Sequence, residues 1–304
     1  MWAWYDECGA TILGQLRKLG CALDFSGENV RFTMDKPRAA GVFEAFRSLW
    51  EKSLIYRSER MINWCTRCGT ALSDIEVEYE DEKSKLWHIR YMFEDGSGSV
   101  TVATSRPETM LGDTAVAVHP EAERYKGLAG KMLRLPLTDR LIPLVADEGV
   151  EKEFGTGAVK VTPAHDPLDF EIGQRHKLEI LRVISYEGRM ANCPSRYEGL
   201  SVQAARKAVV EDLNAAGLLE KEEHYRHSVS KCSRCLSHIE PLVSEQWFIK
   251  MKGLAAPAIE AAEKEKVKFY PPSWKKPFTA WLGNIQDWCI SRQIWWGHRI
   301  PVWY

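Results

Sequence analysis

The sequence predicts an α+β protein in which a β-barrel-like domain is inserted between other segments and is fastened at its base by cysteine pairs. Two observations predict this organisation. Apolar residues follow a helical spacing in residues 1–58, whereas residues 84–222 contain short apolar runs broken by Gly, Pro and Asp, which is typical of strands. The β-rich stretch also lies between two Cys-x-x-Cys pairs, Cys65/Cys68 and Cys232/Cys235.

The composition is that of a globular protein with a buried core. The chain has 304 residues, 45% of them hydrophobic and 27% charged, and its net charge is −1. Because there is no overall basic field, any RNA-binding surface must be local. No apolar stretch approaches the roughly 18 residues that span a bilayer, and the first residues do not resemble a signal peptide. We expect a cytoplasmic protein, and we predict neither a membrane nor DNA as a partner.

Residues 1–58 are expected to be a helical connecting segment. Its apolar residues recur at i, i+3, i+4 and i+7 on one face, as in Val42, Phe43, Phe46, Leu49 and Trp50. Residues 59–83 follow as a first cysteine knuckle, in which Gly69 relieves the tight turn after Cys68.

Residues 84–222 are expected to form the β-rich domain. Five short apolar runs predict strands, and this many strands in so short a stretch favours a barrel-like arrangement. The runs are residues 86–89, 100–103, 115–118, 141–145 and 158–161. A helix is predicted over 201–216, between the N-cap Ser201 and Gly217. A second knuckle is expected over residues 223–247, followed by a further segment over 248–304 that ends in a Trp-rich tail, Trp281–Tyr304.

The cysteine pairs predict a structural zinc site. Cys65, Cys68, Cys232 and Cys235 offer four thiolates, the ligand set that tetrahedral Zn²⁺ prefers in closed sites. The long gap between the pairs is explained if the residues between them form the inserted domain. Two alternatives are a redox dithiol and two separate half-sites, but neither pair lies in a thioredoxin-like context.

A polar run at Gly155–Phe170 predicts one rim of a pocket. Lys160 and Thr162 alternate with valines, so both project from the same face of a strand. With Pro167 in the first turn of a helix, Asp166 is its natural N-cap, and Asp169 lies one turn further on. In the alternative interpretation Asp166 is only a cap, Asp169 is a surface residue and Lys160 pairs with either. His165 is expected to be a structural hydrogen-bonding residue.

A second polar run, Thr104–Thr109, ends another apolar stretch and predicts the opposite rim. Thr104, Arg106 and Thr109 supply its polar side chains. Alternatively, Arg106 and Glu108 form a surface ion pair, which contributes little to stability.

These motifs resemble those of class I aminoacyl-tRNA synthetases for branched aliphatic amino acids. Thr104–Thr109 is similar to the Thr-rich peptide of their editing domain, with Ser105 in place of a frequent threonine, and Gly155–Phe170 is similar to its second signature. The tail Asp287–Pro301 resembles the segment that re-enters the Rossmann catalytic fold. This tail, Gly112-Asp113-Thr114 and the Gly155–Phe170 run are most similar to the valine-specific members.

The resemblance implies an editing site that hydrolyses the ester of threonine mischarged on the 3′ end of tRNA(Val). It implies four catalytic residues: Lys160, Thr162, Asp166 and Asp169. It also implies four substrate-binding residues: Thr104, Arg106, Thr109 and Phe154. Lys160, Asp166 and Thr109 would contact the threonine hydroxyl. Asp169 would hold the α-ammonium, and the terminal adenosine would lie against Thr104, Arg106 and Phe154.

The ATP-binding His-Ile-Gly-His and Lys-Met-Ser-Lys-Ser motifs of these enzymes are absent from the sequence. We therefore expect an internal fragment without valine-activating activity, whereas the full-length enzyme, expected to be a monomer, would use ATP and Mg²⁺. Two alternatives remain open. The chain could be an editing domain of the isoleucyl type, or a zinc-stapled module that only docks tRNA. The docking residues would be Lys264, Lys266, Lys268, Lys275 and Lys276.

Overall fold

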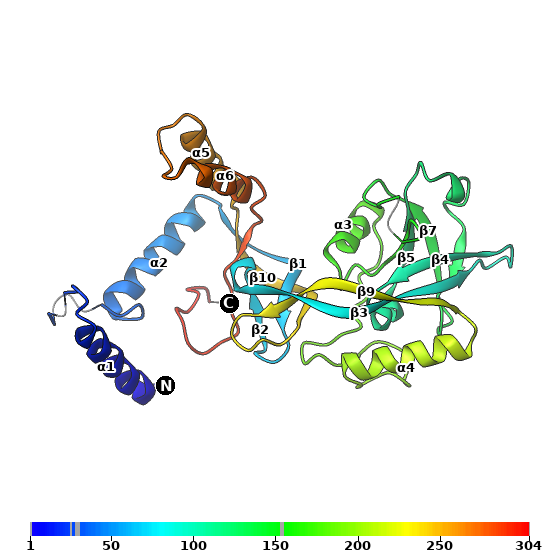
Figure 1. Ribbon diagram of the computed structural model, residues 1–304, viewed down its shortest axis with the longest axis horizontal. Coiled ribbons are helices and arrows are strands. Elements are labelled where there is room, and N and C mark those ends of the chain that lie inside the picture. Colours follow the sequence, from blue (N-terminus) through cyan, green and yellow to red (C-terminus); the bar gives the residue numbers. More distant parts are fainter. Residues whose placement is uncertain (1, 25, 28–30, 153–154, 304) are drawn as a thin grey trace. The chain divides into compact units, whose positions relative to one another are not determined.

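The computed structural model describes residues 2–24, 26–27, 31–152 and 155–303 (Figure 1). The chain divides into two compact units, residues 53–295 and residues 1–52 with 296–304. Among the described residues, no helix is both long enough and apolar enough to cross a membrane.

The smaller unit consists of two helices and the C-terminal segment. Helix α2 begins after Asp35, whose carboxylate accepts a hydrogen bond from the Arg38 backbone N–H at 2.9 Å. Aromatic rings hold the unit together, with the centroid of Trp2 lying 5.6 Å from that of Trp296. The helices are α1 (Trp2–Lys18) and α2 (Lys36–Glu51). Because a strand already begins at Ile55, the last residues of the segment expected to be helical are extended.

The base of the larger unit is a four-stranded sheet in the order β11-β10-β1-β2. Strands β1 and β10 pair antiparallel along their whole length, from Ile55 opposite Ile249 to Cys65 opposite Ile239. This register brings the end of β1 beside the start of β10, where the cysteine knuckles lie. The strands are β1 (Ile55–Cys65), β2 (Thr70–Leu72), β10 (Ile239–Ile249) and β11 (Trp288–Cys289).

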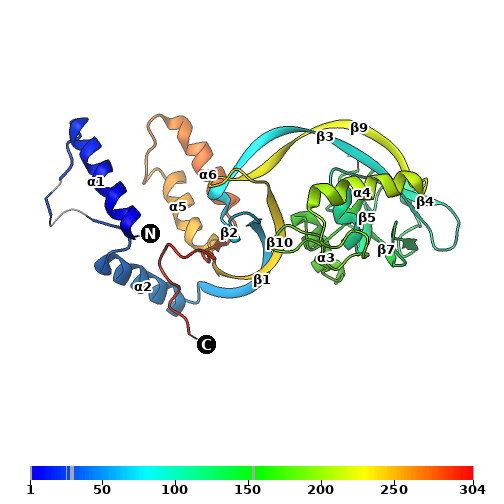
Figure 2. The same cartoon turned by 90° about the horizontal axis from the view of Figure 1, so that it is seen from below.

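A long two-stranded ribbon leaves this base and returns to it (Figures 1 and 2). Its strands, β3 (Val77–Met92) and β9 (Leu219–Cys232), pair antiparallel from Val77 opposite Cys232 onward. Charged cross-strand pairs stabilise the exposed part, as between Lys231 and Glu80, whose atoms lie 2.6 Å apart. Strand β4 (Ser99–Thr104) joins the far part of β3. The β-rich residues are thus an insertion that starts and ends at the cysteines.

The remaining strands form a third sheet in the order β6-β7-β5-β8. Strands β5 and β7 are parallel, whereas the other pairs are antiparallel. The expectation of a barrel is corrected here, because no hydrogen-bonded ladder joins β4 to β8 among the described strands and the sheets stay open. The strands are β5 (Ala115–Val118), β6 (Met132–Arg134), β7 (Leu141–Ala146) and β8 (Ala158–Val161).

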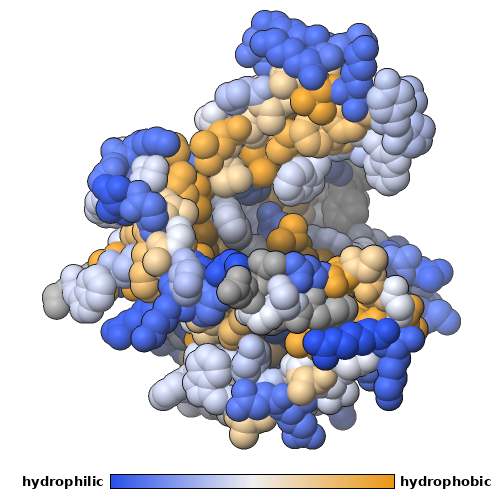
Figure 3. Space-filling view, turned by 90° about the vertical axis from the view of Figure 1, so that its left-hand side faces the viewer, coloured by the Kyte–Doolittle hydropathy of each residue, from blue (hydrophilic) through white to orange (hydrophobic). Residues whose placement is uncertain are grey.

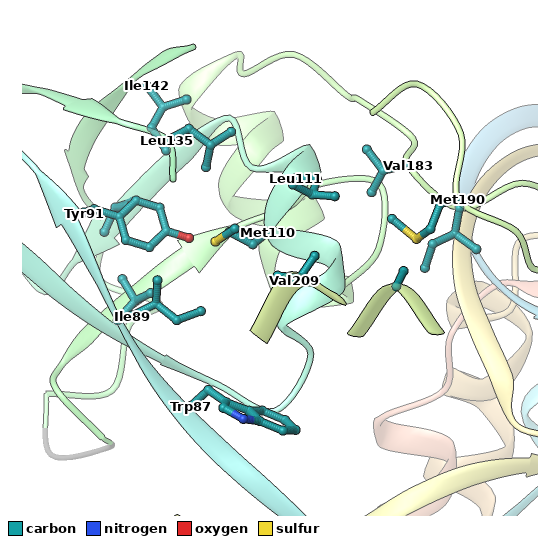
Figure 4. Close-up of a cluster of buried hydrophobic side chains, with 14 of the residues drawn as sticks. Trp87, Ile89, Tyr91, Met110, Leu111, Leu135, Ile142, Val183, Met190 and Val209 are labelled. Atoms are coloured by element: carbon teal, nitrogen blue, oxygen red, sulfur yellow. The ribbon is translucent and has the colours of Figure 1, made fainter. Parts of the chain in front are cut away.

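Helices cover the sheets and complete the core. Helix α4 begins after Ser201, whose hydroxyl accepts from the Ala204 N–H, and Gly217 after it has φ +66°, as its sequence predicted. Side chains from η2, β3, β7 and α4 meet in the buried cluster of Figure 4, where the Tyr91 hydroxyl points inward. The helices are α3 (Pro167–His176), α4 (Val202–Ala215), α5 (Lys252–Glu263) and α6 (Lys275–Gly283). The 3₁₀ turns are η1 (Asp74–Glu76), η2 (Pro107–Gly112), η3 (Glu123–Tyr125) and η4 (Pro272–Trp274).

Candidate functional site

The two cysteine pairs converge on one cluster. The sulfur atoms of Cys65, Cys68, Cys232 and Cys235 all lie within 4.8 Å of one another. Gly69, with φ +61°, allows the tight turn between β1 and β2. Four thiolates at this separation fit a closed tetrahedral zinc site, which has no open position for catalysis. The prediction that both pairs belong to one site is confirmed.

The segment after α6 packs directly beside this cluster. The Gln293 side-chain oxygen accepts a hydrogen bond from the Ala71 N–H at 3.0 Å, and the Gln293 N–H donates to the Thr70 hydroxyl at 2.9 Å. Arg292 pairs with Glu76 in the adjoining turn. The tail therefore extends the base of the unit and is fixed by the same β1–β2 turn that carries Cys65 and Cys68.

A buried polar cluster lies at the end of β8, where the sequence placed the first rim of the pocket. The Lys160 ammonium donates to the Thr162 hydroxyl at 2.5 Å, which confirms that the two side chains share a face. The ammonium also lies 4.0 Å from an Asp169 carboxylate oxygen. The same hydroxyl donates to Asp113 at 2.6 Å, and Asp113 lies 3.7 Å from the Lys160 ammonium.

Asp166 and Asp169 have different environments. Asp166 is exposed and caps α3, accepting from the backbone N–H groups of Leu168 at 2.9 Å and Asp169 at 3.2 Å. The predicted N-cap is thus confirmed. Asp169 is only 3% exposed and accepts from the Thr162 N–H at 2.8 Å. The interpretation of Asp169 as a surface residue is therefore wrong.

Burial sets the protonation of this cluster. Burial raises the pKa of Asp169 to about 8, although the neighbouring Lys160 ammonium lowers it. Burial likewise raises the pKa of Asp113, against the opposing effect of Lys160 and of hydrogen bonds from Thr162 and Tyr91. The Asp169 carboxyl is thus in equilibrium between its neutral and ionised forms near neutral pH.

His165 supports the structure, as expected. Its Nε2 accepts hydrogen bonds from the backbone N–H groups of Val183 at 2.9 Å and Ile184 at 3.3 Å. Burial, followed by the positive charges of Arg106 and Lys160, holds the pKa of His165 well below its usual range. The imidazole is therefore neutral. Its hydrogen bonds link Val183 and Ile184, which follow α3, to the turn that precedes α3.

The second rim is a hydrogen-bonded chain at the end of β4. The Arg106 N–H donates to the Thr104 hydroxyl at 3.0 Å, and the Thr109 hydroxyl donates to the Arg106 carbonyl at 3.0 Å. The Arg106 side chain reaches the His165 carbonyl at 3.4 Å, which links the two rims. Gly155 also approaches β4, since a Cβ there would lie 3.0 Å from the Ala103 Cβ. Phe154 lies outside the described residues.

Arg106 belongs to a buried ionic network, so its interpretation as half of a surface ion pair is wrong. Glu108 is fully buried and accepts two hydrogen bonds from Arg206 at 2.8 Å each. Arg106 contacts Glu108 at 3.4 Å and also pairs with Glu240, a residue of β10. Burial alone raises the pKa of Glu108, but the two arginines hold it below its usual range. The network thus ties the second rim to α4 and to the base sheet.

We expect Glu108→Gln to destabilise the larger unit by about 3 kcal/mol, because it leaves Arg206 without its buried counter-charge and Arg106 with Glu240 alone. Urea denaturation measures this as a lower midpoint. The matched control is Glu44→Gln, which breaks an exposed pair with Arg47 in α2 and should leave the midpoint unchanged. An unchanged midpoint for Glu108→Gln would show that the network does not hold the fold.

The structure adds residues that the sequence did not identify as part of the site. Asp113 and Tyr91 complete the cluster around Lys160, and Glu240 and Arg206 complete the network around Arg106. Asp113 lies two residues before the apolar run of β5, a position that could have marked it. Nothing local in the sequence indicates that β5 pairs with β8, or that β10 reaches Arg106.

Comparison with known proteins identifies the family of the chain. The chain belongs to the family of class I tRNA synthetases (I, L, M and V), which it matches over residues 1–304. It is 57% identical to the valine–tRNA ligase of Carboxydothermus hydrogenoformans, 55% to that of Symbiobacterium thermophilum and 53% to that of Syntrophotalea carbinolica. These matches cover 100% of this chain but 33–34% of each relative, so the chain spans about a third of their length. The family resemblance found in the sequence is confirmed.

Proposed function

We propose that the chain carries the editing activity of a valine–tRNA ligase, the hydrolysis of threonine from mischarged tRNA(Val). The observation that carries this proposal is the buried arrangement of Lys160, Thr162 and Asp169 beside the chain formed by Thr104, Arg106 and Thr109. Similarity to valine–tRNA ligases supports the choice of tRNA. We also propose that the corresponding longer protein joins valine to tRNA(Val) with ATP and Mg²⁺.

The need for such a site follows from the shapes of the two amino acids. Threonine and valine are nearly isosteric, and an apolar pocket cannot strongly reject an isostere that adds only a hydroxyl. A second site can discriminate in the opposite direction if its polar groups pair with that hydroxyl. Valine would leave those groups unpaired, and an unpaired buried polar group costs about 1–3 kcal/mol.

The residues have the following proposed roles. The ionised Asp169 carboxylate binds the α-ammonium of the esterified amino acid. The Lys160 ammonium donates to the side-chain hydroxyl, with Thr109 and Asp166 as further polar partners. Arg106 and Thr104 contact the terminal adenosine. Water then attacks the ester carbonyl, the bond to the ribose oxygen breaks, and that oxygen leaves with a proton. Thr162 holds Lys160 in place for this step.

We propose that zinc stabilises the fold at the base of the larger unit and takes no part in hydrolysis. The four thiolates would hold the ion at the point where the chain enters and leaves the inserted domain. The base strands then keep Glu240 against Arg106, so the fold around the ion also supports the second rim.

Incubation of the chain with threonyl-tRNA(Val) tests the proposal. We expect release of threonine well above the spontaneous rate. Lys160→Ala should slow this release and reduce the preference over valyl-tRNA(Val), since the amino group that contacts the hydroxyl is gone. Release at the spontaneous rate by folded, zinc-loaded protein would overturn the proposal.

The raised pKa of Asp169 predicts a pH dependence. Only the ionised carboxylate attracts an ammonium by charge, and its fraction in the free protein falls about tenfold for each pH unit below the pKa. With a pKa of about 8, kcat/KM for threonyl-tRNA(Val) should rise from pH 6 to about 8. Above this it should fall, because the α-ammonium of the substrate, with an ordinary pKa of about 7.7–8.0, loses its proton. Spontaneous ester hydrolysis also rises with pH and is subtracted. A flat profile from pH 6 to 9 would contradict this role of Asp169.

A second candidate function is tRNA docking by the α5–α6 hairpin. Hydrophilic side chains gather at the top of Figure 3, over this hairpin, where Lys264, Lys266 and Lys268 are exposed. Two aromatic side chains accompany them, Tyr270 at 85% exposure and Trp274 at 62%. Lysines interleaved with exposed aromatics suit phosphate contacts and base stacking.

Removing two of these lysines should weaken tRNA binding. We expect the Lys266→Ala, Lys268→Ala double variant to bind tRNA(Val) less tightly and to reduce the slope of log K against log salt by about 1–2, because fewer counterions are released. Filter binding at several salt concentrations measures the slope. Lys83→Ala, an exposed lysine of the ribbon, is the control. An unchanged slope for the double variant would exclude the hairpin as a docking surface.

A further inference from the structure

Asp113 is the central acceptor of the buried cluster. It is fully buried two residues before β5 and accepts from the Tyr91 hydroxyl at 2.7 Å and from the Thr162 hydroxyl at 2.6 Å, on different carboxylate oxygens. Its own backbone carbonyl accepts from Arg140 at 2.6 Å. These bonds fix both the carboxylate and the backbone that carries it.

The bonds have a direction that follows from the number of protons available. An ionised carboxylate only accepts and an ammonium only donates. The single Thr162 hydroxyl proton therefore points to Asp113, and its oxygen accepts from Lys160. The order of donation is Lys160 to Thr162 to Asp113, with Tyr91 donating from the other side. Each member has one orientation.

We propose that Asp113 is a positioning residue that sets the specificity of the site by fixing the Lys160 ammonium through Thr162. An ammonium held in one place offers its remaining N–H donors at one point of the pocket, where a side-chain hydroxyl accepts and a methyl group cannot. Asp113 thus favours threonine over valine without contacting either. This inference rests on the proposed editing function.

Reversing one bond of the chain tests the inference. In Asp113→Asn the amide can direct an N–H group at Thr162, which turns the Thr162 proton toward Lys160 and displaces the ammonium. Thr162→Val removes the hydroxyl while keeping the shape. We expect both variants to lower the threonine-to-valine ratio of kcat/KM by roughly ten- to a hundredfold. Because both break one chain, the double variant should lose little more than either single variant.

Two control variants separate positioning from general damage to the fold. Tyr91→Phe removes the other hydrogen bond of the same carboxylate but leaves the Thr162 side intact, so it should lower stability and keep the ratio. Thr162→Ser keeps the hydroxyl and should also keep the ratio. A second readout needs no hydrolysis. The ammonium protons of Lys160, protected by their hydrogen bond, should give an NMR signal that survives in Tyr91→Phe and disappears in Asp113→Asn.

The outcomes distinguish this inference from the proposed function. A lower threonine-to-valine ratio and a lost Lys160 signal in Asp113→Asn, with both kept in Tyr91→Phe, support positioning by Asp113. Parent-like selectivity and an intact signal in folded Asp113→Asn would overturn it while leaving the editing function in place. A parent protein without deacylation would overturn the editing function. The NMR comparison would then still decide whether Asp113 fixes Lys160.

Discussion

Asp169→Ala is expected to lose hydrolysis of threonyl- and valyl-tRNA(Val) alike. Removing a charge-assisted hydrogen bond costs roughly 1.5–3 kcal/mol, or about ten- to a hundred and fiftyfold in kcat/KM. The kcat/KM should fall for both substrates because the α-ammonium is common to all aminoacyl esters. The position suits this role, since the carboxylate is nearly buried and lies 4.0 Å from the Lys160 ammonium.

Asp166→Asn is the matched control for Asp169→Ala. Asparagine still caps a helix, so α3 should keep its start while the exposed charge is lost. We expect this variant to erode the preference for threonine at most, and to retain hydrolysis. Rates are compared in variants first shown to be folded and zinc-loaded. If folded Asp169→Ala protein hydrolysed threonyl-tRNA(Val) at the parent rate, the assignment of this cluster as the editing site would be wrong.

Removal of zinc is expected to unfold the base of the larger unit. Structural zinc contributes about 10–16 kcal/mol in small zinc-binding peptides, as much as the whole stability of a typical domain. Here the four thiols join the β1–β2 turn to the end of β9, so the ion would close the loop formed by the inserted domain. Chelation should therefore lower the melting temperature of the larger unit. Elemental analysis of the untreated protein should find about one zinc per chain.

Single cysteine variants test whether the loss comes from this cluster. Cys232→Ser removes one buried ligand and should reproduce the effect of the chelator. Cys8→Ser replaces a cysteine of α1, outside the cluster, and should melt like the parent. The model of a single zinc site would be wrong if the purified parent protein contained no metal and had the same melting temperature as the Cys232→Ser variant.

The sequence alone predicted the features that depend on neighbouring residues. The alternation of polar and apolar residues around Lys160 predicted that Lys160 and Thr162 lie on the same face of β8. The residue types at Asp166 and Ser201 predicted where two helices begin. Each of these follows from local geometry, in which side chains alternate along strands and short polar residues cap helices. The Cys-x-x-Cys spacing likewise indicated the two members of each pair in the thiol cluster.

Features that depend on long-range pairing could not be predicted. Asp113 enters the cluster only because β5 pairs antiparallel with β8, which brings Ala115 opposite Val161. Glu240 reaches Arg106 from a strand of the base sheet, far away in the sequence. The barrel-like expectation failed similarly, because counting strands does not show which edges pair. The charge on Arg106 suggested a surface pair, and only the fold showed its buried partners.

The ratio of hydrolysis rates for threonyl- and valyl-tRNA(Val) tests the central claim most directly. Both esters are prepared on the same tRNA and incubated with zinc-loaded chain under single-turnover conditions, so that only the side chain differs. An unpaired buried polar group costs about 1–3 kcal/mol, so threonine should be released roughly five- to a hundred and fiftyfold faster than valine. Equal rates for the two esters would contradict the claim that this pocket recognises the threonine hydroxyl.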